Sequence, residues 1–383
     1  MRFTCDRSAL VDKLSVLARG VSTRGALPVL SGILLQVHDD RLEMYSTDME
    51  LSMRASLPVK ADRTGDVVVP ARLVTDVVRN MVGEEVSIEA GGADDSSGVT
   101  VAAGAARFQL HAWPAGDFPQ TSAFDLSEAF SVQRIPFLET LGKVGRAASR
   151  DDNRPILTGV LVSIDGSSLR MVATDSYRLA VKQSPLETGP ATEVQAIVPV
   201  KALNEVARLA SAVESETMKV VVGQNQAVFG IDDLVLATRL IEGQFPNYNQ
   251  LIPDAFDHTI ELDREAFLGV VRRVGLLAQK NAPLRLKFMP AGQDDDGEER
   301  PAQLLVRAIT QDVGQAQECI DVPFTAAEPF EIGFNHLFLI DGAESVEGTT
   351  LTLKLISPLR PGLLSGAESG DFLYLIMPIR LSS

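Results

Sequence analysis

Hydrophobic residues recur along this chain with the period of amphipathic helices. Spacings of three and four residues link the hydrophobic positions of two segments: Leu10, Leu14 and Leu17, and Phe137, Leu141 and Val144. Residues at these spacings lie on one face of a helix. We therefore predict a helix around residues 10–17 and another around residues 137–144, each with one buried stripe.

After each of these helices, we predict two strands joined by a turn and then a second helix. The turn between the strands falls on His38-Asp39-Asp40 in one segment and on Asp165-Gly166 in the other, and both sequences favour tight turns. A second helix is expected to begin at Pro70 and again at Pro199, because proline suits a first helical turn. This mixture predicts an α+β fold with antiparallel sheets and helices on one face.

The two segments belong to an internal repeat. Residues 27–35 (LPVLSGILL) resemble residues 154–162 (RPILTGVLV), and residues 116–119 (GDFP) resemble residues 243–246 (GQFP). The matches share an offset of about 127 residues, which is the size of a domain. A weaker third copy includes residues 284–288 and 331–335. We predict three modules, at residues 1–125, 126–253 and 254–383.

Basic residues occupy matching positions in the second helix of the first two copies. Arg72 and Arg79 are two helical turns apart, as are Lys201 and Arg208, so each pair lies on the face opposite the hydrophobic stripe. One such pair can be an ordinary solvated surface, but its repetition favours a shared role. The third copy does not continue the pattern.

The first helices show a similar trend. Arg7, Arg134 and Arg264 stand at equivalent positions of the three copies. More basic residues lie on or just after these helices: Lys143, Arg146, Arg150, Arg272 and Arg273.

The net charge of −16, taken alone, argues against DNA binding, because DNA-binding proteins are usually basic. Acidic residues gather in predicted loops, so we expect an acidic exterior with a basic helical face.

The composition excludes several other classes of protein. No apolar run approaches the roughly 18 residues of a membrane span. The two cysteines have no metal-binding spacing and fit reduced thiols in a cytoplasm. No glycine-rich phosphate loop, nucleophile elbow or histidine pair is present, so neither a cofactor nor a metal is expected. Asp48 and Asp175 recur after threonine, and we interpret them as turn residues rather than as catalytic carboxylates.

The chain resembles the bacterial DNA polymerase III beta subunits, the sliding clamps, over its whole length. Five segments carry the resemblance in the right order: Leu27–Gly32, Ala173–Val181, Phe245–Tyr248, Glu331–Asn335 and Met377–Leu381. The resemblance implies a head-to-tail homodimeric ring around duplex DNA, with sheets outside and helices lining the ring. It also implies a non-catalytic cytoplasmic protein whose partners are double-stranded DNA of any sequence, the polymerase alpha subunit, the clamp loader and other proteins with a clamp-binding motif, but no membrane.

The same resemblance implies three sets of site residues. Arg24 lies in a loop that resembles the DNA-contacting loop of the family and joins the basic residues above. The implied dimer interface brings Phe108 and Leu110 against Leu276 and Leu277, with Arg107 in position to pair with Glu318. The implied pocket for partner peptides comprises Leu157, Thr174, Tyr177, Arg178, Leu179, Pro246, Leu251, Leu359, Pro361, Leu375 and Met377.

Several alternatives stay open from the sequence. Ser176, Tyr177 and Gln250 depart from the commoner family residues, which puts the partner preference in doubt. The leucines of both implied sites can be ordinary core residues, and Arg24 can be a plain surface arginine. The whole chain can be a diverged clamp paralogue, or an acidic interaction scaffold that does not encircle DNA.

Overall fold

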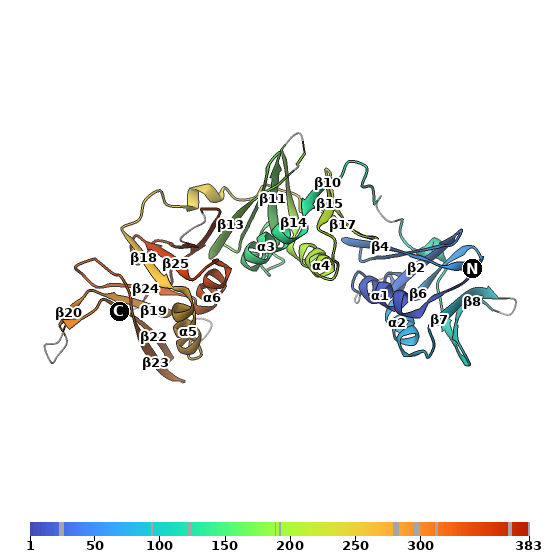
Figure 1. Ribbon diagram of the computed structural model, residues 1–383, viewed down its shortest axis with the longest axis horizontal. Helices are drawn as coiled ribbons and strands as arrows, with labels where there is room; N and C mark the ends of the chain where they lie inside the picture. Colours follow the sequence, from blue (N-terminus) through green and yellow to red (C-terminus); the bar gives the residue numbers. More distant parts are fainter. Residues whose placement is uncertain are drawn as a thin grey trace. The chain divides into compact units, whose positions relative to one another are not determined.

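The computed structural model describes residues 1–22, 27–92, 95–120, 124–187, 189–190, 193–278, 283–293, 299–310, 313–366 and 370–381. These residues form two compact units (Figure 1). Unit 1 comprises Met1–Ile135, Glu187–Pro190 and Lys201–Ile241, and unit 2 comprises Pro136–Leu186, Ala191–Val200 and Glu242–Ser383. The predicted module boundaries near 125 and 253 stay predictions.

The described residues of unit 1 form two antiparallel sheets and three α-helices. The helices are α1 (Arg7–Leu17), α2 (Ala71–Asn80) and α4 (Val200–Ser211), the last of which begins at the border of the unit. One sheet has the order β5 (Lys60–Arg63), β1 (Arg2–Asp6), β7 (Glu85–Gly92), β8 (Asp95–Ala103) and β9 (Ala106–His111). The other has the order β10 (Phe130–Gln133), β15 (Thr217–Val222), β16 (Gln226–Ile231), β17 (Leu234–Arg239), β4 (Leu51–Pro58), β3 (Arg41–Thr47), β2 (Gly32–His38) and β6 (Gly65–Pro70).

Unit 2 has a similar composition. Its helices are α3 (Arg134–Val144), which begins at the border of the unit, α5 (Arg264–Gly275) and α6 (His336–Ser345). The large sheet has the order β14 (Val194–Pro199), β11 (Gly159–Asp165), β12 (Ser168–Thr174), β13 (Arg178–Pro185), β27 (Phe372–Ile376), β26 (Gly362–Gly366), β25 (Thr350–Leu355) and β18 (His258–Asp263). A second sheet has the order β23 (Gly314–Asp321), β22 (Gln303–Thr310), β19 (Leu284–Met289) and β24 (Phe330–Phe334), and β20 (Gly292–Gln293) pairs with β21 (Glu299–Arg300). These antiparallel sheets and helices confirm the predicted α+β fold.

Both large sheets join strands from neighbouring predicted modules. β17 pairs with β4 in unit 1, and β13 pairs with β27 in unit 2, both antiparallel. A shared sheet satisfies the backbone groups that would otherwise be exposed at two strand edges. The predicted second module is therefore divided between the two units.

The predicted helical stripes are confirmed. Leu10, Leu14 and Leu17 are fully buried on α1, and Phe137 and Leu141 are buried on α3. The second helices begin one residue later than predicted, because Pro70 and Pro199 end strands β6 and β14 before α2 and α4 start. Proline has no N–H to donate and suits an extended position beside the helix start.

Three arginines reveal the internal repeat in the structure. Arg7, Arg134 and Arg264 each begin a first helix, and each guanidinium donates hydrogen bonds to carbonyls at the end of the second helix of its module. The accepting helix carbonyls are those of Arg79, Ala210 and Ala343, at 3.3, 3.1 and 3.0 Å. These carbonyls have no partner within their helix, and a cation suits the negative end of the helix dipole. Each of the three arginines thus contacts the C-terminal end of a second helix.

None of the helices in the described residues is both long and apolar enough to cross a membrane.

Candidate functional site

Each repeated Thr-Asp segment ends a strand and closes a tight turn. Asp48 accepts hydrogen bonds through Oδ1 from the N–H groups of Glu50 and Leu51, at 3.0 and 2.7 Å. Asp175 accepts the equivalent bonds from the two residues that follow Ser176, at 2.9 and 3.0 Å. Such bonds replace backbone partners at a turn. The prediction that these aspartates are turn residues is confirmed.

Arg178 lies directly after the second of these turns, and all three nitrogens of its guanidinium donate hydrogen bonds to protein groups. Its Nε donates to Asp175 Oδ2 at 3.1 Å, and Nη1 donates to the hydroxyl of Tyr374 at 3.0 Å and to Asp341. Nη2 donates to the backbone carbonyl of Arg146. The guanidinium also lies over the ring of Phe338, with its carbon 4.3 Å from the ring centroid.

These contacts decide what Arg178 can do. Its side chain is 11% exposed. It joins β13, which belongs to the predicted second module, to α6 and β27, which belong to the predicted third module. Burial raises the pKa of the Tyr374 hydroxyl, which therefore stays neutral beside the guanidinium. Arg178 positions the elements around the predicted peptide pocket, and its guanidinium is not available to a peptide in this conformation.

The strand pairings bring most of the predicted pocket residues to one end of the large sheet in unit 2. Leu179 pairs with Thr174 on one side and with Leu375 on the other. The N–H of Met377 donates to the carbonyl of Tyr177 at 2.8 Å. Leu359 and Pro361 immediately precede β26, whose first residue pairs with Ile376 next to Met377.

The pocket residues fall into a buried group and an exposed group. The side chains of Leu157, Thr174, Leu179 and Leu375 are buried. Four hydrophobic side chains are strongly exposed: Tyr177, Leu251, Leu359 and Met377. Exposed hydrophobic groups at one sheet end are typical of an interaction surface. The buried residues belong to the core of the free chain, as the alternative interpretation of Leu157 and Leu179 allowed, and their part in a peptide pocket stays a prediction.

Pro246 and Leu251 lie near the start of the last segment of unit 2, which begins at Glu242. Leu251 ends the short helix η5 (Tyr248–Leu251), and Pro246 is exposed. The segment approaches the short helix η4 (Pro155–Thr158) at Gly243, where an added Cβ would lie 2.8 Å from Cδ1 of Ile156. Gly243 also has a φ of +126°, so this close approach requires glycine.

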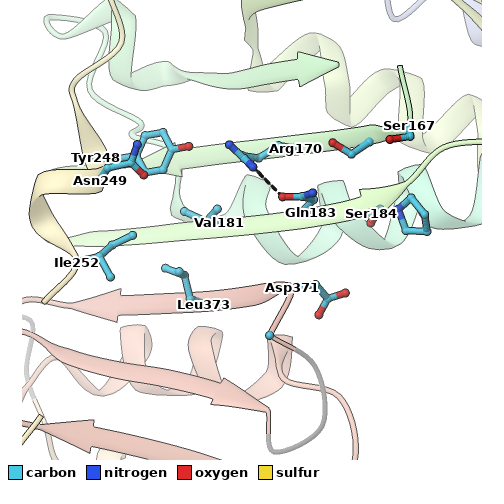
Figure 2. A pocket seen from close by; sticks show the side chains of 13 residues that line it. Ser167, Arg170, Val181, Gln183, Ser184, Tyr248, Asn249, Ile252, Asp371 and Leu373 are labelled. Carbon is cyan, nitrogen blue, oxygen red and sulfur yellow. Dashed lines mark hydrogen bonds between the residues drawn. The ribbon is translucent and has the colours of Figure 1, made fainter. Parts of the chain in front are cut away.

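A separate cavity of about 660 Å³ lies further along the same strands. Figure 2 shows Arg170 on β12 bonded to Gln183 on β13, with Tyr248 and Asn249 of η5 on one side. None of the residues predicted for the peptide pocket lines this cavity. The sequence held no motif for it, because its lining comes from three strands and a connector that only the fold brings together.

The basic residues of unit 1 have acidic neighbours on their own helices. Arg79 pairs with Asp76 at 3.1 Å, and Arg208 lies 3.7 Å from Glu205. Within the described part of the chain, Arg72 makes no ion pair. Arg24 lies outside the described residues.

The basic residues of unit 2 contact carboxylates that the sequence analysis did not single out. Glu344 of α6 accepts from Arg146 and, at 2.8 Å, from Arg272, while Lys143 donates to Glu347. The bonds from the two arginines lower the pKa of Glu344, and the bond from the lysine lowers that of Glu347. Both carboxylates are therefore ionised at neutral pH. A search for basic residues alone missed them.

The residues of the implied dimer interface lie on or near two sheet edges. β9 is the last strand of one sheet in unit 1, and β23 is the last strand of the smaller sheet in unit 2. Phe108 on β9 is 45% exposed, and Leu276 at the end of α5 is 84% exposed. Leu110 is only 6% exposed, so its side chain is buried in the free chain, and its part in the dimer interface stays a prediction.

The two charged interface residues have different surroundings. Arg107 is exposed on β9. Glu318 on β23 accepts two hydrogen bonds from Arg273, at 2.6 and 3.0 Å. The carboxylate expected to receive Arg107 is thus already held by a residue that was expected to face DNA. Leu277 is half-buried, and its carbonyl accepts from the Thr310 hydroxyl at 2.6 Å.

Family models of the DNA polymerase III beta subunit match the chain in three consecutive parts. The N-terminal domain matches residues 1–122, the central domain residues 132–247 and the C-terminal domain residues 249–380.

Individual relatives match over the same length. The chain is 31% identical to the beta sliding clamp of Synechococcus elongatus, with all of both chains covered. The crystal structure of the DNA polymerase sliding clamp from Caulobacter crescentus matches with a TM-score of 0.89 at 30% identity, again over all of both chains. A sliding clamp from Pseudomonas aeruginosa bound to griselimycin has the same TM-score at 28% identity and full coverage. The likeness therefore includes all three parts of the repeat.

Proposed function

Because this chain belongs to the DNA polymerase III beta subunit family, we propose that it acts as a sliding clamp that encloses duplex DNA as a head-to-tail homodimer. In this role it tethers the replicative polymerase and other replication and repair proteins, and it performs no chemical step itself. The full-length match to sliding clamps of known structure carries the proposal. We place its action in the cytoplasm, where its DNA lies.

Two free sheet edges support the head-to-tail dimer. β9 ends a sheet in unit 1 and β23 ends a sheet in unit 2, so each edge has backbone groups available for a strand of a second chain. Two different edges make a heterologous interface, which must close into a ring or continue as a filament. Phe108 and Leu276 supply exposed hydrophobic side chains near these edges.

Enclosure explains how an acidic chain can stay on DNA. A ring is retained by its topology, so strong phosphate contacts are unnecessary, and contacts without base readout permit movement along any sequence. The net charge of −16 then limits non-specific adhesion.

Retention on DNA tests the proposed enclosure. Protein loaded by a clamp loader onto nicked circular plasmid is expected to elute with the DNA from a sizing column. It should be lost once the plasmid is cut, because a ring can slide off an end. Equal retention on circular and linear DNA would show ordinary contact binding. No retention at all, under conditions in which a clamp of known activity loads, would favour the acidic scaffold or a diverged paralogue.

We further propose that partner peptides dock on the exposed hydrophobic surface formed by Tyr177, Leu251, Leu359 and Met377. The buried leucines below it supply a rigid floor, and the methionine side chain can adapt to different partners. Arg178 holds the strands and α6 that carry this surface. The departures at Ser176 and Tyr177 bear on which peptide sequences bind best.

We expect Leu359→Asp to weaken peptide binding by about 10- to 100-fold, the equivalent of losing about 1.5–3 kcal/mol of leucine burial. Leu359 is 65% exposed, so the substitution should leave the fold intact. Fluorescence anisotropy with a labelled peptide from the polymerase alpha subunit measures the change. Leu337→Asp, also exposed but on α6, is the matched control. Unchanged affinity of the Leu359 variant would exclude this surface.

A further inference from the structure

Helix α6 differs from the second helices of the other modules in its charge. α2 and α4 carry the basic residues predicted to face DNA. α6 and the residues just after it instead carry Asp341, Glu344 and Glu347 at spacings of three. Asp341 and Glu344 are three apart on α6 and so lie on the same face, whereas Glu347 follows the end of the helix. In Figure 1, α6 lies beside α5, which carries Arg272.

The carboxylates after Asp341 use their oxygens on cations of neighbouring elements. Glu344 binds Arg146 through Oε2 and Arg272 through Oε1, so one carboxylate bridges two arginines from different elements. Glu347 binds Lys143 through Oε1. Glu344 and Glu347 therefore already hold three of the cations predicted to face DNA in the free chain.

The two arginine pairs of Glu344 contribute little to stability, whereas Lys143 is only 13% exposed and its pair with Glu347 is partly shielded from solvent. The side chains of Arg146 and Arg272 are about half exposed, at 44% and 50%. Ion pairs this open to solvent contribute little to the free energy of folding. Their effect on an incoming anion is larger, because a carboxylate and a phosphate offer the same oxygen acceptors to a guanidinium.

We propose that Glu344 and Glu347 occupy the places that DNA phosphates would take on Arg146, Arg272 and Lys143, and thereby weaken the hold of this chain on DNA. The inference rests on the proposed function, in which these helices face the enclosed duplex. A phosphate must displace a carboxylate before it gains each cation, so no phosphate contact becomes strong. A clamp that is retained by topology benefits, because weak contacts let it slide.

The double variant Glu344→Gln/Glu347→Gln tests the proposal in the full-length protein. The substitutions keep the size of the side chains and remove two negative charges. We expect the affinity for a short linear duplex to rise about tenfold at about 50 mM salt. The dependence of log affinity on log salt should also become steeper, by about 0.9 for each cation that gains a phosphate. Fluorescence anisotropy over a salt series gives both quantities.

A matched control separates local release of the cations from the change in net charge. Glu261→Gln/Glu328→Gln removes the same two charges from β18 and from the exposed segment before β24 of the same unit, where neither carboxylate holds one of the cations predicted to face DNA. If this control gains as much affinity and slope as the test variant, the carboxylates act only through net charge and the proposal is overturned.

A second measurement addresses the bridging carboxylate directly. Arg272→Gln should weaken DNA binding more in the Glu344→Gln background than in the wild type, because only there is the guanidinium released to a phosphate. Equal losses in the two backgrounds would contradict the proposal. Retention of the wild type on circular plasmid is measured alongside. If the wild type is retained and the variants behave as their control, only this inference fails; if the wild type is not retained, the proposed function fails first and the inference with it.

Discussion

The variant Phe108→Asp/Leu276→Asp should be a monomer at concentrations at which the wild type is a dimer. In the proposed ring, each interface would receive two carboxylates in place of exposed hydrophobic side chains. Burying a charge without a partner is costly, and a loss of about 4 kcal/mol at an interface weakens it roughly a thousandfold. Sedimentation velocity over a range of concentrations measures the change.

The control for this variant carries the same kind of change elsewhere. Val82 and Leu337 are also exposed hydrophobic residues, and neither lies on β9, β23 or α5. Val82→Asp/Leu337→Asp should therefore remain a dimer. A Phe108/Leu276 variant that still sediments as a dimer would rule out the interface assigned here. In the proposed ring, Arg107 must compete with Arg273 for the carboxylate of Glu318.

Arg178→Ala should destabilise unit 2 by about 3–5 kcal/mol, the usual cost of removing one partner from a buried ion pair. The substitution leaves the carboxylates of Asp175 and Asp341 and the hydroxyl of Tyr374 without their shared donor. It also separates β13 from α6, which lie in different predicted modules. Peptide binding should fall with it, because the docking surface depends on that junction.

The two units permit a selective measurement of this loss. The single tryptophan, Trp113, lies in unit 1, so its fluorescence reports unit 1 while far-UV circular dichroism reports both units. In urea, Arg178→Ala should lower the midpoint of the part of the circular dichroism transition that reports unit 2. The urea midpoint of the fluorescence transition should not change. Arg170→Ala, which loses only two exposed hydrogen bonds to Gln183 in the same unit, should change stability by no more than about 0.5 kcal/mol. Equal effects of the two substitutions would show that Arg178 is not a structural anchor.

Local patterns in the sequence determined the helices and the turns. The stripes at Leu10, Leu14 and Leu17 predicted buried helix faces, since helical period depends only on neighbouring residues. The Thr-Asp turns followed from side chains that bond backbone groups two and three residues away. The repeat also gave the equivalent positions of Arg7, Arg134 and Arg264, although their contact with the second helices was visible only in the fold.

Only the tertiary structure decided which distant residues meet. The pairing of β13 with β27 joins residues almost two hundred positions apart, and no local pattern specifies such a partner. That pairing places Tyr374 within reach of Arg178, which thereby anchors β13 to β27, while its predicted contact with a peptide stays a prediction. The burial of Leu110 could not be distinguished in sequence from the exposure of Phe108, since both are hydrophobic residues of one strand. The sequence likewise showed Lys143, Arg146 and Arg272 as free basic residues, because the carboxylates of Glu344 and Glu347 reach them only when α6 packs against its neighbours.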